Sequence, residues 1–333
     1  MVTIAHKVIQ REASSHPIAK LVLRRLTGGV LTLLAVSLIV FFATSVLPGN
    51  AAYAILGRNA TPAALRTLEQ ALHIDRGFFA NYWSWLHSLV LGHFGHSLVN
   101  RQAVGALVGQ RIVNSVALLV VAGVVSTLVA GVLGVVAALR RDGIFDHASS
   151  VLALVVTALP EFVVAVLLVF VFATNVFHLL PGLSDLAPGT HPWDQPKALV
   201  LPALTLTLVT VPYLFRMIRG SMIEALESDY VQWAKLKGLS VWRVTVVHAL
   251  PNALAPSIQV MGLNLLYMAG GIVIVENVFG YPGVGQGLVD AVTARDVPVV
   301  QFMVLVLAAF YILVNITTDV LVLLVTPRRR LPR

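Results

Sequence analysis

The sequence predicts an all-α integral membrane protein with six transmembrane helices. Of its 333 residues, 58% are hydrophobic and only 11% are charged, whereas about a quarter of the residues of a soluble domain are charged. The mean hydropathy of +0.87 points the same way. Such a chain has too little polar surface to be a soluble enzyme, a disordered chain or a nucleic-acid-binding protein. Its pI near 10.1 reflects basic residues beside apolar runs, not one basic patch.

The six crossings follow from long apolar runs with few or no charges. A bilayer core of roughly 30 Å needs about 20 helical residues at about 1.5 Å each. The third crossing contains Pro160 and Glu161, so we expect a kink, a tilt or a partly interfacial start in it. The predicted crossings are residues 26–47, 115–139, 148–177, 199–215, 258–275 and 299–325.

The positions of Lys and Arg predict which side of the membrane each segment faces. Sixteen of the 23 lie in four segments on one side, and seven lie in three segments on the other. Cytoplasmic segments carry the excess of Lys and Arg, so both termini are predicted to be cytoplasmic, with the protein in the cell membrane. The inner segments are 1–25, 140–147, 216–257 and 326–333, and the outer segments are 48–114, 178–198 and 276–298.

The first apolar run is expected to remain as a crossing. Its core of 22 residues is longer than the roughly 7–15 residues of a cleaved signal peptide. The outer segment that follows it contains an aromatic-rich stretch at residues 78–85. Aromatic residues are enriched at membrane–water interfaces, so we expect a helix at the lipid headgroups there.

The inner segment 216–257 reads as two short helices broken at Gly238, a natural helix end. The second helix is expected to return to the membrane and stop near Pro251. The apolar face predicted for the first helix consists of Tyr230, Val231, Ala234 and Leu236. A rigid knob of this kind would fit a groove in a cytoplasmic partner and pass movement to the membrane helices. The alternative is a surface helix on anionic lipid, which its lysines would also favour.

The sequence lacks the motifs that would supply chemistry or energy. It has no G-x-x-x-x-G-K-[ST] loop and no H-E-x-x-H or G-x-S-x-G motif. Its lack of cysteine excludes disulfides and thiolate metal sites. Its ten histidines are scattered, so no metal site and no catalytic residue is predicted. The energy for transport must come from a partner chain or from an ion gradient.

The inner segment resembles the EAA loop of ABC importer permeases, whose pattern is E-A-A, three residues, G, nine residues and I-x-L-P. The pattern is matched at Ala234, Gly238, Leu250 and Pro251. It differs at Gln232, Trp233 and His248, which stand where the pattern has its glutamate, its first alanine and its isoleucine. The resemblance implies an ATPase-coupling surface that includes Tyr230, Gln232, Ala234, Lys237, Gly238, Leu239, His248, Leu250 and Pro251.

Further motifs extend the resemblance over almost the whole chain, to the dipeptide/oligopeptide branch of that family. Residues 276–285 are similar to E-x-x-F-x-x-P-G-x-G, the most specific single match. Residues 92–97 resemble G-D-F-G-x-S with His93 in place of the acid, and residues 295–301 resemble R-D-Y-P-x-V-Q. Weaker similarities lie at residues 24–26, 47–49, 315–319 and 326–328.

This resemblance implies a type I ABC importer permease fold and a set of partners. These are a second homologous permease subunit, two cytoplasmic ATPase subunits or domains, and an extracytoplasmic substrate-binding protein. ATP and Mg²⁺ would bind the ATPases, and this chain would bind no cofactor. It would form half of a pathway for peptides through the lipid bilayer and perform no bond chemistry itself.

The outer segment 276–298 is a candidate gate. Its glycines and proline impose a tight backbone, and irregular backbone at membrane depth is tolerated only where it is buried in protein or lines a water-filled cavity. The alternative is a plain surface turn. The candidate gate residues are Glu276, Phe279, Gly280, Pro282, Gly283 and Gly285.

Two acidic residues are predicted inside crossings, where a charge costs roughly 2.5–3.5 kcal/mol. Glu161 either lines the pathway and meets the amino terminus of a peptide, or it caps a half-helix or faces a neighbouring subunit. Asp319 is predicted to be structural and to pair with a partner helix or with an arginine near the inner face.

Other functions fit the sequence less well. A proton-coupled secondary transporter would use these two acids, but no inverted repeat is visible. A membrane scaffold would need no pathway at all. Within the family, importers of nickel, glutathione, heme and oligosaccharides share the permease pattern, so the substrate stays open at this point.

Overall fold

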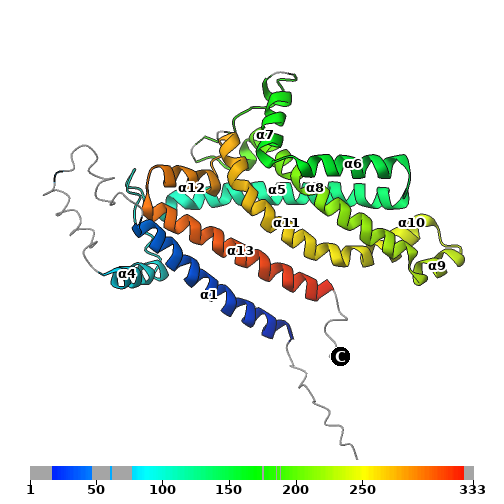
Figure 1. The fold of residues 1–333 in the computed structure, drawn as a ribbon, viewed down its shortest axis with the longest axis horizontal. Helices are drawn as coiled ribbons and strands as arrows, with labels where there is room; N and C mark the ends of the chain where they lie inside the picture. Colours follow the sequence, from blue (N-terminus) through cyan, green and yellow to red (C-terminus); the bar gives the residue numbers. More distant parts are fainter. Residues whose placement is uncertain are drawn as a thin grey trace, which may run out of the picture.

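The computed structural model describes residues 17–46, 61, 77–174, 176–184, 186–187 and 189–325. Within these ranges the chain is helical, apart from connecting turns and one isolated bridge between His96 and Ala103. Most helices run roughly along one long axis (Figure 1). The leader before residue 17, most of the outer segment before residue 77 and the tail 326–333 lie outside the described residues.

The helices bear the labels of Figure 1. In chain order they are α1 (Pro17–Val46), α4 (Phe78–Val90), α5 (Val104–Leu139), α6 (Ile144–Ala158), α7 (Glu161–Val169), α8 (Pro196–Glu227), α9 (Asp229–Leu236), α10 (Val241–Arg243), α11 (Leu250–Phe279), α12 (Val284–Thr293) and α13 (Val297–Val325). Shorter π-helical and 3₁₀ turns lie at Phe170–Thr174, Val244–Ala249 and Pro192–Asp194.

Five of these helices, α1, α5, α8, α11 and α13, contain segments long and apolar enough to cross a membrane. α6 and α7 pass the same test only as a pair, bent by 103°. α6 starts at the end of the molecule where α9 lies (Figure 1). The chain after α7 reaches the opposite end, because Ser184 N donates to Phe279 O at 2.7 Å and Gln110 Nε2 donates to Thr190 O at 3.2 Å. The bent pair is therefore the sixth crossing.

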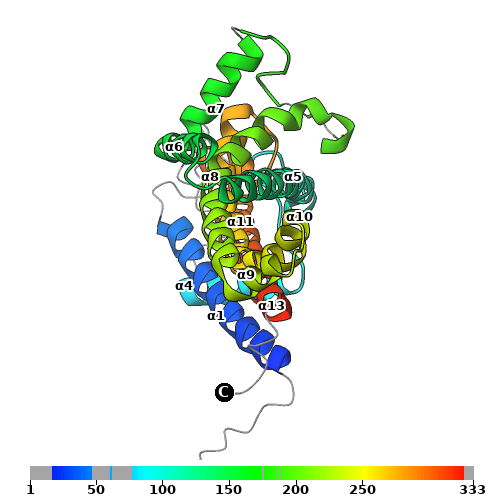
Figure 2. The ribbon, with the colours of Figure 1, turned by 90° about the vertical axis from the view of Figure 1, so that its right-hand side faces the viewer.

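The bend lies at Pro160, where the sequence predicts a kink. The residue before a proline is disfavoured in the helical region, and Leu159 is extended with ψ of 132°. Proline also has no N–H to continue the helical ladder of α6. As a result α7 turns away from the bundle instead of prolonging α6 (Figures 1 and 2).

α8 is the central helix of the bundle. Its most apolar window is 72% buried, against 22–33% for the other four crossings. Figure 2 looks along the long axis and shows α8 between α5, α6 and α11. Its core contacts with α5 and α11 include Leu118, Leu201, Leu206, Met268 and Ile272.

α1 and α13 pair beside this bundle, and α4 covers the outer end of α1. The aromatic-rich stretch is helical as predicted. Phe41 of α1 lies 5.3–5.5 Å, between ring centroids, from Phe78, Tyr82 and Trp85 of α4. The Tyr82 and Ser37 hydroxyls are 2.8 Å apart, which fixes α4 against α1.

Several helices extend beyond the predicted crossings. α5 begins at Val104 instead of Ser115, and its 36 residues give a length of about 54 Å at about 1.5 Å per residue, more than the hydrocarbon core. α8 continues to Glu227 and α11 begins at Leu250, so the inner segment shrinks from 216–257 to 228–249. Hydropathy detects the part of a helix that suits hydrocarbon, whereas these polar ends continue because they pack on neighbouring helices.

The predicted helix end at Pro251 is wrong. The chain passes from the π-helical turn Val244–Ala249 directly into α11, with Pro251 in its first turn. Proline is tolerated in the first turn of a helix because its missing N–H would be unpaired there.

The predicted outer loop is also more regular than its glycines indicate. α11 continues through Glu276 to Phe279, and residues 284–293 form α12. Residues 280–283 form the turn between the two helices. Gly280 takes a φ of 62° as the end cap of α11, a left-handed conformation that favours glycine.

Candidate functional site

Residues 228–249, here called the elbow, join α8 to α11 at one end of the molecule (Figure 1). α9 follows Ser228 and ends at Lys237, after which Gly238 takes a φ of 77°. Gly238 N donates to Lys235 O at 2.9 Å and closes the helix end. A residue with a Cβ is disfavoured in this left-handed conformation by about 1–2 kcal/mol. The predicted break at Gly238 is therefore present.

A small apolar core connects the elbow to the membrane helices. Val231 and Ala234 of α9 are buried with Val244 and Ala249 of the second arm. The same core contains Ala138, Met222, Ala225 and Ala253, and Leu239 and Leu250 pack at its edge. Close-packed interiors transmit strain, so a force on the elbow reaches α8 and α11.

The opposite side of the elbow exposes large apolar side chains. Trp233, Leu236, Val241 and Trp242, here called the elbow tip, are 64%, 77%, 71% and 76% exposed. The apolar face predicted for α9 is therefore wrong in part, because Leu236 and Tyr230 are exposed while Val231 and Ala234 form the buried face. Exposed clusters of large apolar residues mark interaction sites.

Polar contacts hold the two arms of the elbow together. Gln232 Nε2 donates to Leu226 O at 3.1 Å. Asn252 Nδ2 donates to Tyr230 Oη and to His248 O, both at 3.0 Å. A glutamate carboxylate at position 232 has no N–H to donate. Gln232, in place of the family's glutamate, thus gives α9 a hydrogen bond to the last turn of α8 that the glutamate cannot make.

A buried carboxylate organises the opposite end of the molecule. Glu276 is 0% exposed, and its Oε2 accepts hydrogen bonds from Gly285 N at 2.6 Å and Gln286 N at 3.1 Å. Its Oε1 accepts one from Ser115 Oγ at 2.5 Å, and Ser115 Oγ accepts one from Val284 N at 2.8 Å. The first N–H groups of a helix have no partner within the helix, and a negative charge is favoured beside them. Glu276 therefore caps α12.

Residues 276–285 are here called the outer cap, after the predicted outer segment in which they lie. The glycines of this outer cap are required because other atoms approach their Cα atoms closely. A Cβ at Gly283 would overlap the Glu276 carboxylate, and one at Gly285 would lie 2.5 Å from Val273 Cα. Phe279 is 0% exposed and Gly283 is buried. Most of residues 276–285 are thus packed against other parts of the protein, which does not fit a plain surface turn.

Side chains of α5 lock the outer cap. Asn114 Nδ2 donates to Pro282 O at 2.8 Å, and Arg111 Nη1 donates to Gly283 O at 3.1 Å. Tyr281 Oη donates to Asn114 O at 2.8 Å, and burial raises the pKa of the Tyr281 phenol, which keeps the donor proton in place. The sequence analysis missed Arg111, Asn114 and Ser115. They could have been found as three polar residues at the start of an otherwise apolar crossing.

A second contact joins two of the family-like motifs. Asp296 Oδ1 accepts a hydrogen bond from Leu98 N at 3.0 Å, and its Oδ2 accepts one from the Ser97 hydroxyl. Residues 92–97 and 295–301 therefore meet, although 199 residues separate the partners Ser97 and Asp296.

The two acids predicted inside crossings have different surroundings. Asp319 Oδ2 lies 2.5 Å from Arg25 Nε, so it pairs with an arginine of α1, as predicted. Glu161 begins α7 and packs against Gly271 of α11 beside Tyr267. Glu161 Oε2 is buried and has no hydrogen-bond partner within the described part of the chain.

A further acid, which is buried, was missed by the sequence analysis. Asp146 is 2% exposed, and both its oxygens accept hydrogen bonds from the Arg219 guanidinium, one of them at 2.6 Å. This pair fixes the start of α6 to α8. Both residues lie outside the crossings predicted from hydropathy, so no search for acids inside crossings could find them.

The half of α8 that leads to the elbow exposes one narrow stripe. Its exposed positions are spaced by three or four residues, and they therefore share one face of the helix. They are Tyr213, Arg216, Gly220, Glu224 and Glu227. A face in contact with lipid is apolar, whereas polar side chains within a membrane face water or protein. Glu224 and Glu227 belong to the polar end of α8, so it is the part of the stripe from Tyr213 to Gly220 that marks a side of the bundle not facing hydrocarbon.

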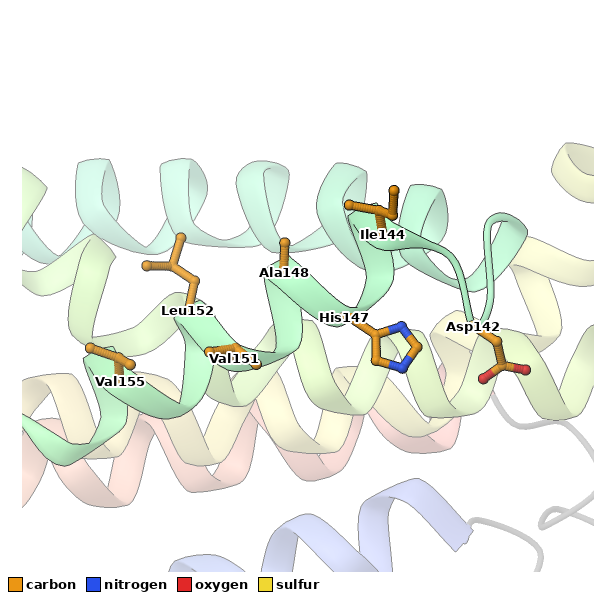
Figure 3. A pocket seen from close by; sticks show the side chains of 7 residues that line it. All are labelled: Asp142, Ile144, His147, Ala148, Val151, Leu152 and Val155. Atoms are coloured by element: carbon orange, nitrogen blue, oxygen red, sulfur yellow. The ribbon is translucent and has the colours of Figure 1, made fainter.

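A shallow groove of about 640 Å³ lies on α6. Figure 3 shows its lining side chains on α6 and on the turn before it, so the groove is the surface of one helix and not a site between helices. The lining residues are Asp142, Ile144, His147, Ala148, Val151, Leu152 and Val155. Most of them are apolar, as expected of a helix that contacts lipid.

The apolar crossings, the elbow and the buried outer cap define a multi-pass membrane protein with a cluster of exposed large apolar side chains at one end. Comparison with known families agrees. The model of the binding-protein-dependent transport system inner membrane component matches residues 130–331, and the model of its N-terminal part matches residues 18–122. The chain belongs to this family, which confirms the predicted ABC importer permease class.

Similar proteins cover nearly the whole chain. A probable peptide ABC transporter permease of Sinorhizobium fredii is 32% identical over 310 residues, 93% of this chain and 98% of the relative. A putative peptide permease of Brucella suis biovar 1 is 36% identical over 313 residues, with 92% and 97% covered. The glutathione transport system permease of Escherichia coli is 32% identical over 309 residues, with 93% and 98% covered.

Proposed function

We propose that this chain is the permease subunit of an ATP-driven importer of dipeptides or oligopeptides and forms one half of its pathway. The family and the names of the relatives support this function. The glutathione relative supports glutathione as a second candidate substrate, which is itself a small peptide.

The observation that carries the proposal is the exposed elbow tip on an elbow that shares one core with α8 and α11. Aromatic anchors dominate the affinity of protein interfaces. An ATPase that held Trp233 and Trp242 would therefore both bind the permease and move its central helix. Two such ATPases, which carry the ATP and Mg²⁺, serve this chain and a second homologous permease, while a substrate-binding protein delivers peptide at the opposite end.

The pathway itself is assigned to the polar stripe of α8, which the second permease would close into a water-filled route. Four of the predicted coupling residues hold the elbow in shape: Tyr230 and Gln232 by hydrogen bonds, Ala234 by packing and Gly238 by its backbone. The outer cap around Glu276 supports the outer gate from behind. Its residues are buried, so we assign them to holding the gate in shape and not to contact with substrate.

The elbow is assigned to the cytoplasm, because the positive-inside rule places most Lys and Arg at that end. α1 begins and α13 ends near the same end (Figure 1), so both termini are cytoplasmic in this proposal. A proton-coupled carrier is the weaker alternative, since Asp319, one of the two acids it would use, is held in an ion pair by Arg25.

The proposal is tested by purifying the tagged full-length chain from its native membrane and measuring ATP hydrolysis in the captured complex. The double variant Trp233→Ala/Trp242→Ala should retain about a tenth or less of that ATPase activity, because hot-spot residues contribute about 2 kcal/mol or more each. Trp193→Ala is the matched control, since Trp193 is 61% exposed near the opposite end. Uptake of peptide into vesicles driven by a pH gradient, with no ATPase present, would contradict the proposal.

A further inference from the structure

Glu161 and Arg216 lie at the two ends of a continuous set of side chains on α7, α8 and α11. Tyr267 lies beside Glu161, and its ring centroid is 5.9 Å from that of Tyr213. The guanidinium carbon of Arg216 lies over the Tyr213 ring, 5.5 Å from its centroid. Arg216 Nη2 also donates to Thr157 Oγ1 at 3.2 Å, just before the bend that leads to Glu161.

This set lies near the middle of the membrane helices. Tyr213 is close to the midpoint of α8, and Tyr267 is close to the midpoint of α11. Membrane transport proteins that work by alternating access bind their substrates near the bilayer midplane. The position therefore suits a substrate contact better than a structural ion pair at a helix end.

The set is open on one side, and its two charged groups have neutral partners. Tyr213 and Tyr267 are 39% and 48% exposed, and Arg216 belongs to the exposed stripe of α8. Within the described part of the chain, the ion pairs do not include Glu161 or Arg216. Glu161 Oε2 also lacks any hydrogen-bond partner there. A buried acceptor without a partner is costly unless a ligand or another chain completes it.

We propose that Glu161 and Arg216 form a subsite that holds the two charged ends of a short peptide at mid-membrane, an inference that rests on the proposed function. The Glu161 carboxylate would accept hydrogen bonds from the peptide's ammonium group, and the Arg216 guanidinium would donate to its terminal carboxylate. Tyr213 and Tyr267 would flank the peptide between them. The Tyr267 and Tyr213 ring centroids are 5.9 Å apart, and the Arg216 guanidinium carbon lies 5.5 Å from the Tyr213 centroid. Together these distances correspond to a few extended residues at about 3.3–3.6 Å each.

The bend at Pro160 is part of this arrangement. It ends α6 after Thr157 and starts α7 at Glu161, so the acid faces α11 at mid-depth instead of continuing along the α6 helix. This explains why a residue that costs energy within a membrane is found there.

The test measures binding of radiolabelled trialanine, N-acetyl-trialanine and trialanine amide to the purified permease–ATPase complex without the binding protein. Glu161→Gln should weaken trialanine binding about tenfold and leave N-acetyl-trialanine unchanged, because only the free ammonium needs the charge. Arg216→Gln should weaken trialanine by a similar factor and leave the amide unchanged. Glu161→Asp, which keeps the charge, should retain the preference for a free amino terminus.

Arg140→Gln is the matched control, because Arg140 is an exposed cation at the end of α5. It should leave binding of all three peptides unchanged. Equal weakening of free and blocked peptides by Glu161→Gln or Arg216→Gln would overturn the subsite, and so would an absence of any effect or of any binding to the wild-type complex. ATP-dependent import of trialanine with the binding protein present tests the proposed function separately. Import that does not distinguish free from blocked peptide ends would refute the subsite alone. A lack of ATP-dependent import of any peptide would refute the function.

Discussion

Glu276 shows how one side chain can determine the shape of a whole segment. Its carboxylate receives the Ser115 hydroxyl and two backbone N–H groups of α12. The turn must then pass so close to the carboxylate that Gly283 leaves no room for a Cβ. The glycine and the acid in this motif therefore depend on each other: the acid caps the helix, and the glycine lets the helix reach the acid.

Gly283→Ala should lower the free energy of unfolding by about 1–3 kcal/mol, because the added methyl overpacks a buried site. Glu276→Ala should cost about 1–3 kcal/mol, because buried donors are left unpaired. The double variant should be less destabilised than the sum of the two, since removal of the carboxylate makes room for the methyl. Denaturant unfolding of the purified protein measures all three.

Asp290→Asn is the control for this comparison of the two single variants with the double variant. Asp290 is exposed and lies 3.7 Å from Arg111, so the loss of its ion pair should change stability by about 0–1 kcal/mol. Strict additivity of Gly283→Ala and Glu276→Ala would contradict the close approach. Valine at Gly283 and Gly285 would disturb the same packing, so loss of uptake in such a variant would not by itself identify a gate.

The elbow is the element whose geometry matters most for the proposed coupling. Its two arms differ in construction: α9 is a regular helix closed by Gly238, whereas the second arm is a π-helical turn that continues into α11. A movement of the second arm therefore acts directly on a membrane helix. α9 acts through the shared apolar core with α8.

Gly238→Ala should loosen the end of α9, because alanine is disfavoured at a φ of 77° by about 1–2 kcal/mol. The backbone amides of α9 should then exchange with solvent deuterium roughly 5–30-fold faster. Hydrogen-exchange mass spectrometry of the complex measures this change. Gly131→Ala in α5, where a Cβ meets nothing within 4 Å, should leave the exchange in α9 unchanged. Equal exchange in both variants would show that the break does not depend on the left-handed glycine.

On the scale of the whole molecule, the bent crossing decides the topology. With α6 and α7 as one crossing, α8 runs back toward the elbow end, and α1 begins and α13 ends near that end as well (Figure 1). Without this crossing, each later helix would cross the membrane in the opposite direction. Asp146 with Arg219 and the Thr157–Arg216 contact fix α6 along α8, which supports this path.

The chain has no cysteine, so single cysteines can report its orientation directly. In right-side-out vesicles, His93→Cys should react with a membrane-impermeant maleimide. Lys235→Cys should react only after the membrane is permeabilised. Both residues are exposed, so accessibility within the protein does not limit labelling. The reverse pattern would place the elbow outside and contradict coupling to a cytoplasmic ATPase.

The crossings, the glycine break of the elbow and the family can be read from the sequence alone. They depend on local features: apolar runs about as long as a bilayer is thick, a glycine where a helix ends, and motifs of about twenty residues or fewer. It could also indicate that Asp319 needs a partner, either another helix or an arginine, because an unpaired charge within a membrane is costly.

Which residues meet depends on the tertiary structure. Glu276 contacts Ser115 across 161 residues, Ser97 contacts Asp296 across 199, and Arg216 contacts Thr157 across 59, just before the bend at Pro160. Periodicity and hydropathy describe one helix at a time, whereas these contacts depend on how helices pack and where their ends fall. The same reason explains why Leu236, apolar in sequence, is exposed at the elbow tip, and why charged Glu276 is fully buried.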